Sequence, residues 1–125
     1  QIAQSTVSEK IDYINTHGTS TPVGDTTELK AIREVFTEDL PRFSTSKSLC
    51  GHSLGATGVQ EAIHCLMMIE NNFIMPSINV MDIDPDVGSM PLVTECIKDA
   101  NVNTVMSNSF GFGGTNASLI MQKYK

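Results

Sequence analysis

The strongest constraint on the fold lies near the end of the sequence, where glycines interrupt two apolar stretches. Val102 to Phe110 contains several β-branched residues, and Ala117 to Tyr124 is again largely apolar. Between them stands Gly111-Phe112-Gly113-Gly114, and glycine accepts the positive φ angles that tight turns need. The two stretches are therefore predicted to be the strands of one hairpin.

A strand and a helix are predicted in the first third of the chain. Ile11 to Asn15 alternates apolar and polar residues, which predicts a short strand. After a loop rich in Gly, Thr, Ser and Pro, Asp25 with Glu28 three residues later predicts a helix start with a capping box. Helical spacing then places three apolar residues on one face of this helix: Leu29, Ile32 and Phe36.

A second helix is predicted to begin near Ser53 and to end at Asn71-Asn72. The side chains expected on its buried face are Val59, Ile63, Leu66 and Met67, and the residues that widen this face to near-total burial are Ala56, Ala62 and Ile69. A strand, two helices and a closing hairpin together predict an α/β layer structure.

Composition excludes several classes of partner. Fourteen acidic residues against eight lysines and arginines give a formal net charge of −6, which disfavours nucleic acid and anionic membranes. The longest apolar run, Cys65 to Ile69, is far shorter than the ~20 residues of a membrane span. Three cysteines without a CxxC motif favour a reducing, cytoplasmic compartment over a disulfide framework. Because the histidine and cysteine spacings match no zinc pattern, no metal site is predicted.

Two histidines lie where a polar ligand could be bound. His17 ends the first predicted strand and precedes several hydroxyl residues, which suits hydrogen bonding to a ligand; a histidine satisfied within a capped loop explains it equally well. His52 precedes the second helix, where the positive end of the helix dipole favours a neutral imidazole that can donate an N–H to a carbonyl. The alternative for His52 is a side chain that only packs at the helix entrance.

One segment imitates a hydrolase motif. Gly51 to Gly55 fits G-x-S-x-G, the nucleophile elbow of α/β-hydrolases. That family needs an acid and then a histidine after the serine. Here the downstream histidine is His64, and Glu61, the acid between, sits three residues before it in the same helix. The spacing therefore excludes a catalytic triad.

Two further features need partners or ligands. Glu61 in the second helix, if buried, requires a counter-charge, and Lys47 in the preceding loop is the candidate; a solvated glutamate is the alternative. The glycine-rich turn after Phe110 lacks the full phosphate-binding pattern. It either aims backbone N–H groups at a ligand oxygen or is a plain hairpin turn.

Three of these segments, in this order, resemble the C-terminal part of a 3-oxoacyl-[acyl-carrier-protein] synthase, a condensing enzyme of fatty acid synthesis. The segments are His17 to Asp25, Lys47 with Gly51 to Ala56, and Asn108 to Asn116. The resemblance extends from Ile11 onward and is most similar to the type I enzymes. It implies a thiolase-like α/β fold, of which residues 1–125 are expected to form a single partial domain: an incomplete C-terminal half with a mixed sheet and two helices.

The resemblance also implies a role for individual residues. The implied catalytic residues are His17, His52, Lys47 and Glu61, with the lysine and the glutamate forming a pair. The implied substrate-binding residues are Thr19 and Thr21, which bind the pantetheine arm of the carrier protein, and Phe112, a gate whose backbone N–H contributes to an oxyanion hole.

The activity implied by the resemblance is decarboxylative condensation of malonyl-carrier protein with an acyl-enzyme. Acyl carrier protein is the expected partner, because its phosphopantetheine arm carries the substrates. No further cofactor is expected. The resemblance also implies a homodimer for the full-length enzyme. The family's nucleophilic cysteine lies in the N-terminal half, and none of Cys50, Cys65 and Cys96 has a matching context. We therefore expect an inactive fragment that supplies the histidine pair. The alternative is a folded module that retains only binding or assembly surfaces.

Overall fold

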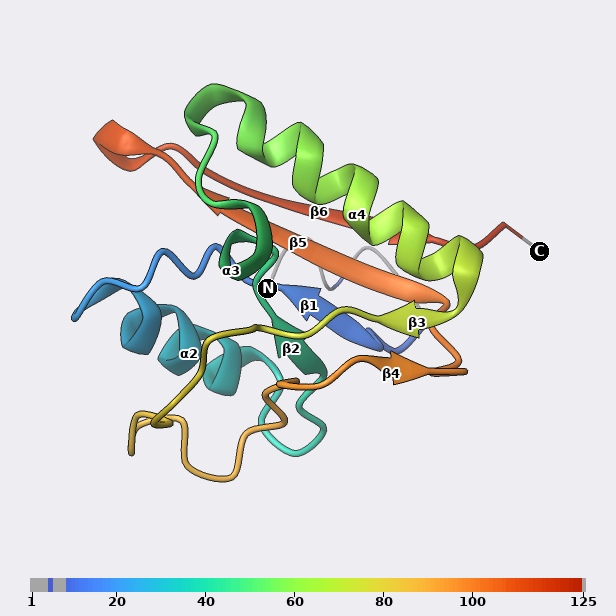
Figure 1. The fold of residues 1–125 in the computed structure, drawn as a ribbon, viewed down its shortest axis with the longest axis horizontal. Coiled ribbons are helices and arrows are strands. Elements are labelled where there is room, and N and C mark those ends of the chain that lie inside the picture. The colour runs from blue at the N-terminus through green and yellow to red at the C-terminus, as the bar shows by residue number, and fades with distance from the viewer. Residues whose placement is uncertain (1–4, 6–8, 125) are drawn as a thin grey trace.

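A four-stranded mixed sheet runs through the computed structural model of the chain, which describes residue 5 and residues 9–124 (Figure 1). Its strands are β1 (Tyr13–Asn15), β2 (Arg42–Ser44), β5 (Thr104–Phe110) and β6 (Asn116–Gln122), in the order β2-β1-β5-β6. β1 pairs in parallel with β2 and with β5, whereas β5 and β6 are antiparallel. The predicted mixed sheet and the closing hairpin are therefore confirmed, and β2 is a strand that the sequence did not indicate.

The turn of the hairpin behaves as its glycines predict. A short 3-10 turn, η2 (Phe112–Gly114), connects β5 to β6. Gly113 and Gly114 have φ angles of 80° and 86°, values that side chains with a Cβ adopt only at a cost. A second, two-stranded sheet of β3 (Phe73–Ile74) and β4 (Ile97–Lys98) lies beside the main sheet and was not predicted.

Both predicted long helices are present. They are α2 (Gly24–Val35) and α4 (Thr57–Asn71), and the shorter helical segments α3 (Lys47–Cys50) and η1 (Leu54–Ala56) precede α4. Asn72 ends α4 in the left-handed conformation, with φ 55°, as a C-terminal cap commonly does. In the part of the chain that the structure describes, no helix combines the length and apolar character needed to cross a membrane.

The predicted capping box at the start of α2 is wrong. The N-cap residue is Val23, and it makes no side-chain capping bond. Asp25 instead accepts a hydrogen bond from the backbone N–H of Ser20. The carboxylate of Glu28 turns away from the helix end because the backbone after β1 offers it two N–H groups, as described below.

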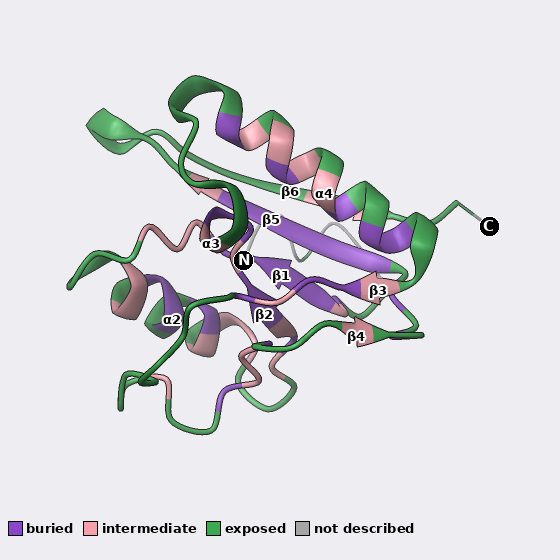
Figure 2. Cartoon of the chain, in the orientation of Figure 1, coloured by how far each residue is buried: buried purple, intermediate pink, exposed green. Residues whose placement is uncertain are grey.

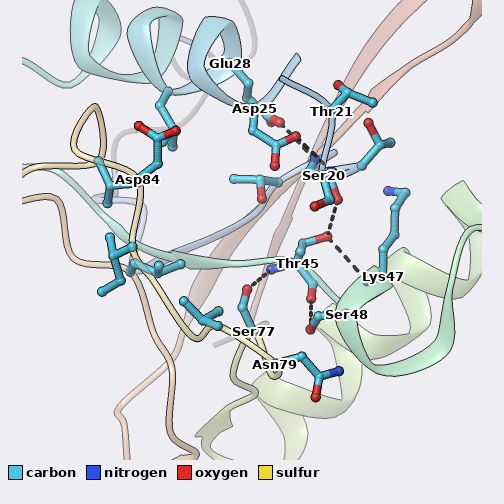
Figure 3. Close-up of a pocket in the computed structure, with 18 of the residues that line it drawn as sticks. Ser20, Thr21, Asp25, Glu28, Thr45, Lys47, Ser48, Ser77, Asn79 and Asp84 are labelled. Carbon is cyan, nitrogen blue, oxygen red and sulfur yellow. Dashed lines mark hydrogen bonds between the residues drawn. The ribbon is translucent and has the colours of Figure 1, made fainter. Parts of the chain in front are cut away.

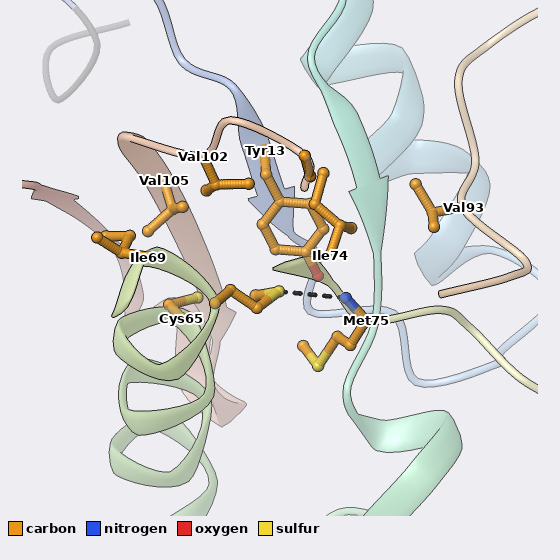
Figure 4. Close-up of a cluster of buried hydrophobic side chains, with 10 residues drawn as sticks. Tyr13, Cys65, Ile69, Ile74, Met75, Val93, Val102 and Val105 are labelled. Atoms are coloured by element: carbon orange, nitrogen blue, oxygen red, sulfur yellow. Dashed lines mark hydrogen bonds between the residues drawn. The ribbon is translucent and has the colours of Figure 1, made fainter. Parts of the chain in front are cut away.

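The two long helices cover opposite faces of the sheet. Alternate residues of a strand point to opposite faces, so Tyr13 and Val105 pack with α4, whereas Ile14 and Met106 pack with α2. Figure 4 shows the α4 side, where Cys65 and Ile69 approach the ring of Tyr13 and Val105. The α2 side contains Leu29 and Ile32, as predicted.

The predicted buried face of α4 is also wrong. The residues that face the sheet are Thr57, Glu61, Cys65, Met68 and Ile69. Four of the residues expected to be buried point outward instead, and we call them the outer face of α4: Val59, Ile63, Leu66 and Met67, exposed by 66%, 51%, 52% and 47%. Ile69, which was expected to widen the buried face, is buried as predicted. Figure 2 shows this alternation of buried and exposed turns along α4. The helix has this orientation because the glutamate finds its counter-charge on the sheet side.

Candidate active site

The candidate site lies at the edge of the sheet where three parallel strands end. β1 ends two residues before His17, β2 ends three residues before Lys47, and β5 ends at Phe110. The carboxyl ends of parallel strands meet at one edge, where open α/β sheets commonly bind ligands. The topology therefore brings together residues that are far apart in the sequence.

The two predicted histidines are neighbours. The rings of His17 and His52 meet edge to face, with their centroids 5.6 Å apart and their planes at 89°. The ring of Phe110 packs against His17 on another side, at 5.5 Å between centroids. Sequence reasoning did not select Phe110, whose only signal was its place at the end of a predicted strand beside the turn.

The hydrogen bonds of His52 define its tautomer. The backbone N–H of Leu54 lies 3.1 Å from Nδ1 of His52, and Oγ1 of Thr57 lies 2.9 Å from the same nitrogen. A backbone N–H can only donate, so Nδ1 must be an acceptor. The ring proton therefore resides on Nε2, which leaves one N–H available for a ligand.

His17 has a cationic neighbour that acts in the same sense. Nζ of Lys47 lies 3.5 Å from Nδ1 of His17, and an ammonium group has only donors. Burial lowers the pKa of His17, and the positive charge of Lys47 lowers it further. A neutral imidazole with its proton on Nε2 is therefore the favoured form of His17 as well.

The predicted pair of Lys47 and Glu61 is present. Nζ of Lys47 forms a buried ion pair with Oε1 of Glu61, and the two side chains are only 5% and 1% exposed. The hydroxyl of Ser109 donates to the other carboxylate oxygen at 3.4 Å. A buried carboxylate of this kind needs a charged partner and further donors, and this one has both.

Glu28 belongs to the same region and was missed as a site residue. Its carboxylate accepts the backbone N–H groups of His17 and Gly18 at 3.0 and 3.1 Å, and Nδ2 of Asn108 at 3.1 Å. Burial raises the pKa of Glu28, although these three hydrogen bonds act in the opposite direction. Glu28 thus fixes the backbone that carries His17, and no local pattern distinguishes it from a capping residue.

An open cavity of about 720 Å³ is lined by His52 and by Thr16 and Gly18, the two neighbours of His17 in the chain, but not by His17 itself. Thr19, Thr21, Lys47 and His52 are among its lining residues, so it unites both predicted substrate-binding threonines with two predicted catalytic residues. Figure 3 shows its hydroxyl-rich wall, where Thr45 accepts a hydrogen bond from the backbone N–H of Lys47 at 3.3 Å.

The other predicted substrate-binding residue stands apart. Phe112 is fully exposed at the tip of the hairpin, in η2. The ring that packs on His17 is that of Phe110, two residues earlier. Among the described residues, no group of three or more His, Cys, Asp or Glu side chains is placed to hold a metal ion.

Comparison with known proteins identifies relatives of this chain. The family described as "Beta-ketoacyl synthase, C-terminal domain" matches residues 2–81. The chain is 56% identical over 125 residues to 3-oxoacyl-[acyl-carrier-protein] synthase 1 of Escherichia coli, covering 100% of this chain and 30% of that protein. It is 48% identical over 117 residues to the mitochondrial 3-oxoacyl-[acyl-carrier-protein] synthase of Arabidopsis thaliana, covering 89% of this chain and 25% of that protein.

Solved structures share the fold. The ishigamide ketosynthase/chain length factor superposes with a TM-score of 0.84 at 41% identity, covering 92% of this chain and 28% of that one. A ketosynthase from module 1 of the bacillaene synthase of Bacillus amyloliquefaciens FZB42 superposes with a TM-score of 0.87 at 29% identity, covering 99% of this chain and 26% of that one. These neighbours show the thiolase-like fold of ketosynthases.

The matched proteins are considerably longer than this chain. It spans about 30% of the length of the curated relatives named 3-oxoacyl-[acyl-carrier-protein] synthase 1 that it matches over nearly its whole length. The family match covers well over half of the chain. Along the chain, the two histidines are followed by the glycine-rich turn, which is the order that the resemblance requires. The chain belongs to the beta-ketoacyl synthase family and corresponds to its C-terminal domain.

Proposed function

We propose that this chain supplies the enolate-stabilising half of a 3-oxoacyl-[acyl-carrier-protein] synthase active site. The reaction is the decarboxylative condensation of malonyl-carrier protein with an acyl-enzyme. The observation that carries the proposal is the contact between the rings of His17 and His52, each with Nδ1 facing a donor. Two Nε2–H groups on adjoining rings are the donors that a thioester oxygen needs.

The chemistry explains why two neutral imidazoles suit this step. Loss of carbon dioxide from a malonyl thioester leaves a carbanion equivalent, and its negative charge develops on the thioester oxygen. Fixed donors aimed at that oxygen are worth on the order of 3 kcal/mol of barrier each in comparable sites. A neutral imidazole stabilises the charge by hydrogen bonding and need not give up its proton.

Lys47 and Glu61 are the proposed electrostatic support of this pair. The ammonium group of Lys47 lies beside Nδ1 of His17, where a second positive charge on the imidazole would be repelled. Glu61, on the sheet-facing side of α4, balances the charge of the lysine. The pair therefore holds His17 neutral while keeping the buried charges matched.

The proposed partner is an acyl carrier protein, which presents the substrate on its phosphopantetheine arm. Thr19 and Thr21 line the cavity beside His52 and are proposed to bind that arm, and Phe112 is proposed to act as a gate. Among the solved neighbours, one is a type II PKS acyl-carrier protein in complex with its ketosynthase bound to the hexaketide, 28% identical and with a TM-score of 0.84. No further cofactor is proposed.

The rest of the enzyme is proposed to come from a polypeptide region that this chain does not contain. That region supplies the nucleophilic cysteine. The outer face of α4, with Leu66 52% exposed, is an exposed apolar surface of the kind that marks an interface, and we propose that this region covers it. Residues 1–125 then act as one partial domain of a cytoplasmic, homodimeric condensing enzyme. The isolated chain is not expected to elongate acyl-carrier protein.

A chimeric enzyme tests this proposal. This chain replaces the corresponding 30% of the Escherichia coli synthase, and condensation is measured with malonyl- and acyl-carrier protein. We expect the chimera to form 3-oxoacyl product. His17→Ala or His52→Ala should lower its kcat by about 10²–10³-fold. The matched control His64→Ala, at a residue outside the cavity, should change kcat by less than about twofold. The rate of the intact chimera should fall only below pH 6.5, because the pKa of His17 is lowered from that value.

Two outcomes would contradict the proposal. If both histidine variants keep the rate of the intact chimera, the pair does not stabilise the enolate. If the chimera folds and binds carrier protein but makes no product, the chain is a binding or assembly module, which is the second interpretation that its sequence allows.

A further inference from the structure

Thr57 begins α4 with a side chain that is turned toward the site. It is 5% exposed, and its hydroxyl oxygen lies 2.9 Å from Nδ1 of His52. It takes no part in capping the helix, since the N-cap residue is Ala56 and no side-chain capping bond is made. A buried hydroxyl needs a hydrogen-bond partner, and this one finds it in the imidazole.

The direction of this hydrogen bond follows from a third group. The backbone N–H of Leu54 points at the same Nδ1 from 3.1 Å, and it cannot rotate to become an acceptor. A proton on Nδ1 would therefore face the amide proton of Leu54. With Nδ1 unprotonated, both Leu54 and Thr57 can donate to it, and the hydroxyl of Thr57 is free to do so because its proton rotates.

Thr57 is also a stiff support. A β-branched side chain in a helix has few rotamers, and its place at the start of α4 fixes its backbone. Leu54 lies in the short 3-10 turn η1, and this residue is 73% exposed. Of the two donors to His52, the buried hydroxyl is therefore the one held by the regular helix.

We propose that Thr57 is a positioning residue for His52: its hydroxyl holds the imidazole as the Nε2–H tautomer in the orientation that the condensation requires. The inference rests on the proposed function of the histidine pair, which it deepens by naming the group that sets one of the two donors. Thr57 acts through His52 and makes no contact with the reacting atoms.

Nitrogen NMR of the histidine rings tests this inference without any need for turnover. In the 125-residue chain, labelled at its histidines, Nδ1 of His52 should show the chemical shift of an unprotonated nitrogen and Nε2 that of a protonated one. Thr57→Val removes the hydroxyl and keeps the shape, so the ratio of Nε2–H to Nδ1–H tautomers should fall about fivefold, the effect of one neutral hydrogen bond. Thr57→Ser keeps the hydroxyl and should keep the ratio.

Kinetics of the chimera supply a second readout. Thr57→Val should lower kcat about fivefold and leave KM within about twofold, because a misplaced donor matters most when the oxygen becomes charged. Thr57→Ser should restore kcat, which a purely steric role of the methyl group does not predict. Thermal unfolding of both variants verifies that they are folded to the same extent.

The outcomes separate this inference from the proposed function. A proton found on Nδ1 of His52 in the unsubstituted chain overturns the inference, even if the valine variant fails to fold. A tautomer ratio unchanged in Thr57→Val overturns it too, whatever the activity of the chimera. The proposed function, in contrast, is decided by His17→Ala and His52→Ala alone.

Discussion

The two faces of the sheet each bury one glutamate next to the histidines, and they stabilise it in different ways. On the α4 face, Glu61 is 1% exposed and is paired with the ammonium group of Lys47. On the α2 face, Glu28 is 5% exposed, and its hydrogen-bond donors within the described part of the chain are the neutral N–H groups of His17, Gly18 and Asn108. The same residue type thus holds a cation on one face and a loop on the other.

The difference shows what each carboxylate contributes to the site. Neutral N–H donors do not fully compensate the loss of water around a charge, and accordingly burial raises the pKa of Glu28. That arrangement is suited to fixing the backbone at His17. The ion pair on the other face fixes a positive charge beside the imidazole instead. Geometry and electrostatics are therefore divided between the two faces.

Breaking the ion pair should have the largest effect. Lys47→Ala leaves Glu61 buried without a counter-charge, and loss of one partner of a buried pair lowers the free energy of unfolding by about 3–5 kcal/mol. Urea denaturation of the chain measures this loss.

The matched control is the exposed pair of Lys10 and Asp39, whose side chains are 60% and 69% exposed. Lys10→Ala should change the free energy of unfolding by at most about 1 kcal/mol. A loss for Lys47→Ala that is no greater than the loss for Lys10→Ala would show that the two faces do not differ in the way described.

Glu28→Gln should have an intermediate effect. The amide NH₂ replaces an oxygen that accepts hydrogen bonds, so one buried N–H loses its acceptor, and the free energy of unfolding at pH 7 should fall by about 1–3 kcal/mol. Glu34→Gln, on the exposed side of the same helix, is the matched control and should be nearly neutral. Equal losses in the two variants would contradict the assigned role of Glu28.

The pH dependence sharpens this test. The pKa of Glu28 is raised from 4.5 in the folded chain, so the folded state keeps a proton that the unfolded chain has released. The free energy of unfolding should therefore fall as the pH rises through the window that begins at 4.5. Glu28→Gln should remove that fall, and urea titrations of both proteins between pH 4 and 7 measure it.

The smallest effect is expected for Ser109→Ala. Its hydroxyl donates to Glu61 at 3.4 Å, a long bond to a carboxylate already paired with a lysine, so the free energy of unfolding should fall by about 0.5–1 kcal/mol. Asn108→Ala should be more damaging, because the donors that remain to Glu28 are the neutral backbone N–H groups of His17 and Gly18, and neither carries a charge that would compensate the loss. If Ser109→Ala lowers the free energy of unfolding as much as Asn108→Ala does, the two glutamates do not differ in how they are stabilised.

The sequence predicted the elements that local chemistry defines. The glycines of the hairpin turn, the helical spacing of Leu29 and Ile32, and the end of α4 at Asn72 all occur as expected. The ion pair of Lys47 and Glu61 was predictable because a buried carboxylate needs a counter-charge and the sequence offers few.

Elements that depend on distant partners could not be predicted in this way. β2, β3 and β4 are two or three residues long, too short for a periodic pattern, and pairing alone makes them strands. The orientation of α4 was mispredicted because apolar periodicity favours burying Val59 and Ile63, whereas the pairing of Glu61 is a tertiary interaction. The contact of Phe110 with His17 also requires β1 and β5 to lie side by side.

The sequence by itself determined which residues could do the chemistry: two histidines next to loops, one lysine, one glutamate and a glycine-rich turn. Their order along the chain is specific to one family. Only the tertiary structure decided that the two rings touch, that Glu28 anchors the first of them and that Thr57 and Leu54 direct the second. The physical reason is that residue types and turns are local properties, whereas hydrogen-bond direction and burial depend on which chain segments the sheet places side by side.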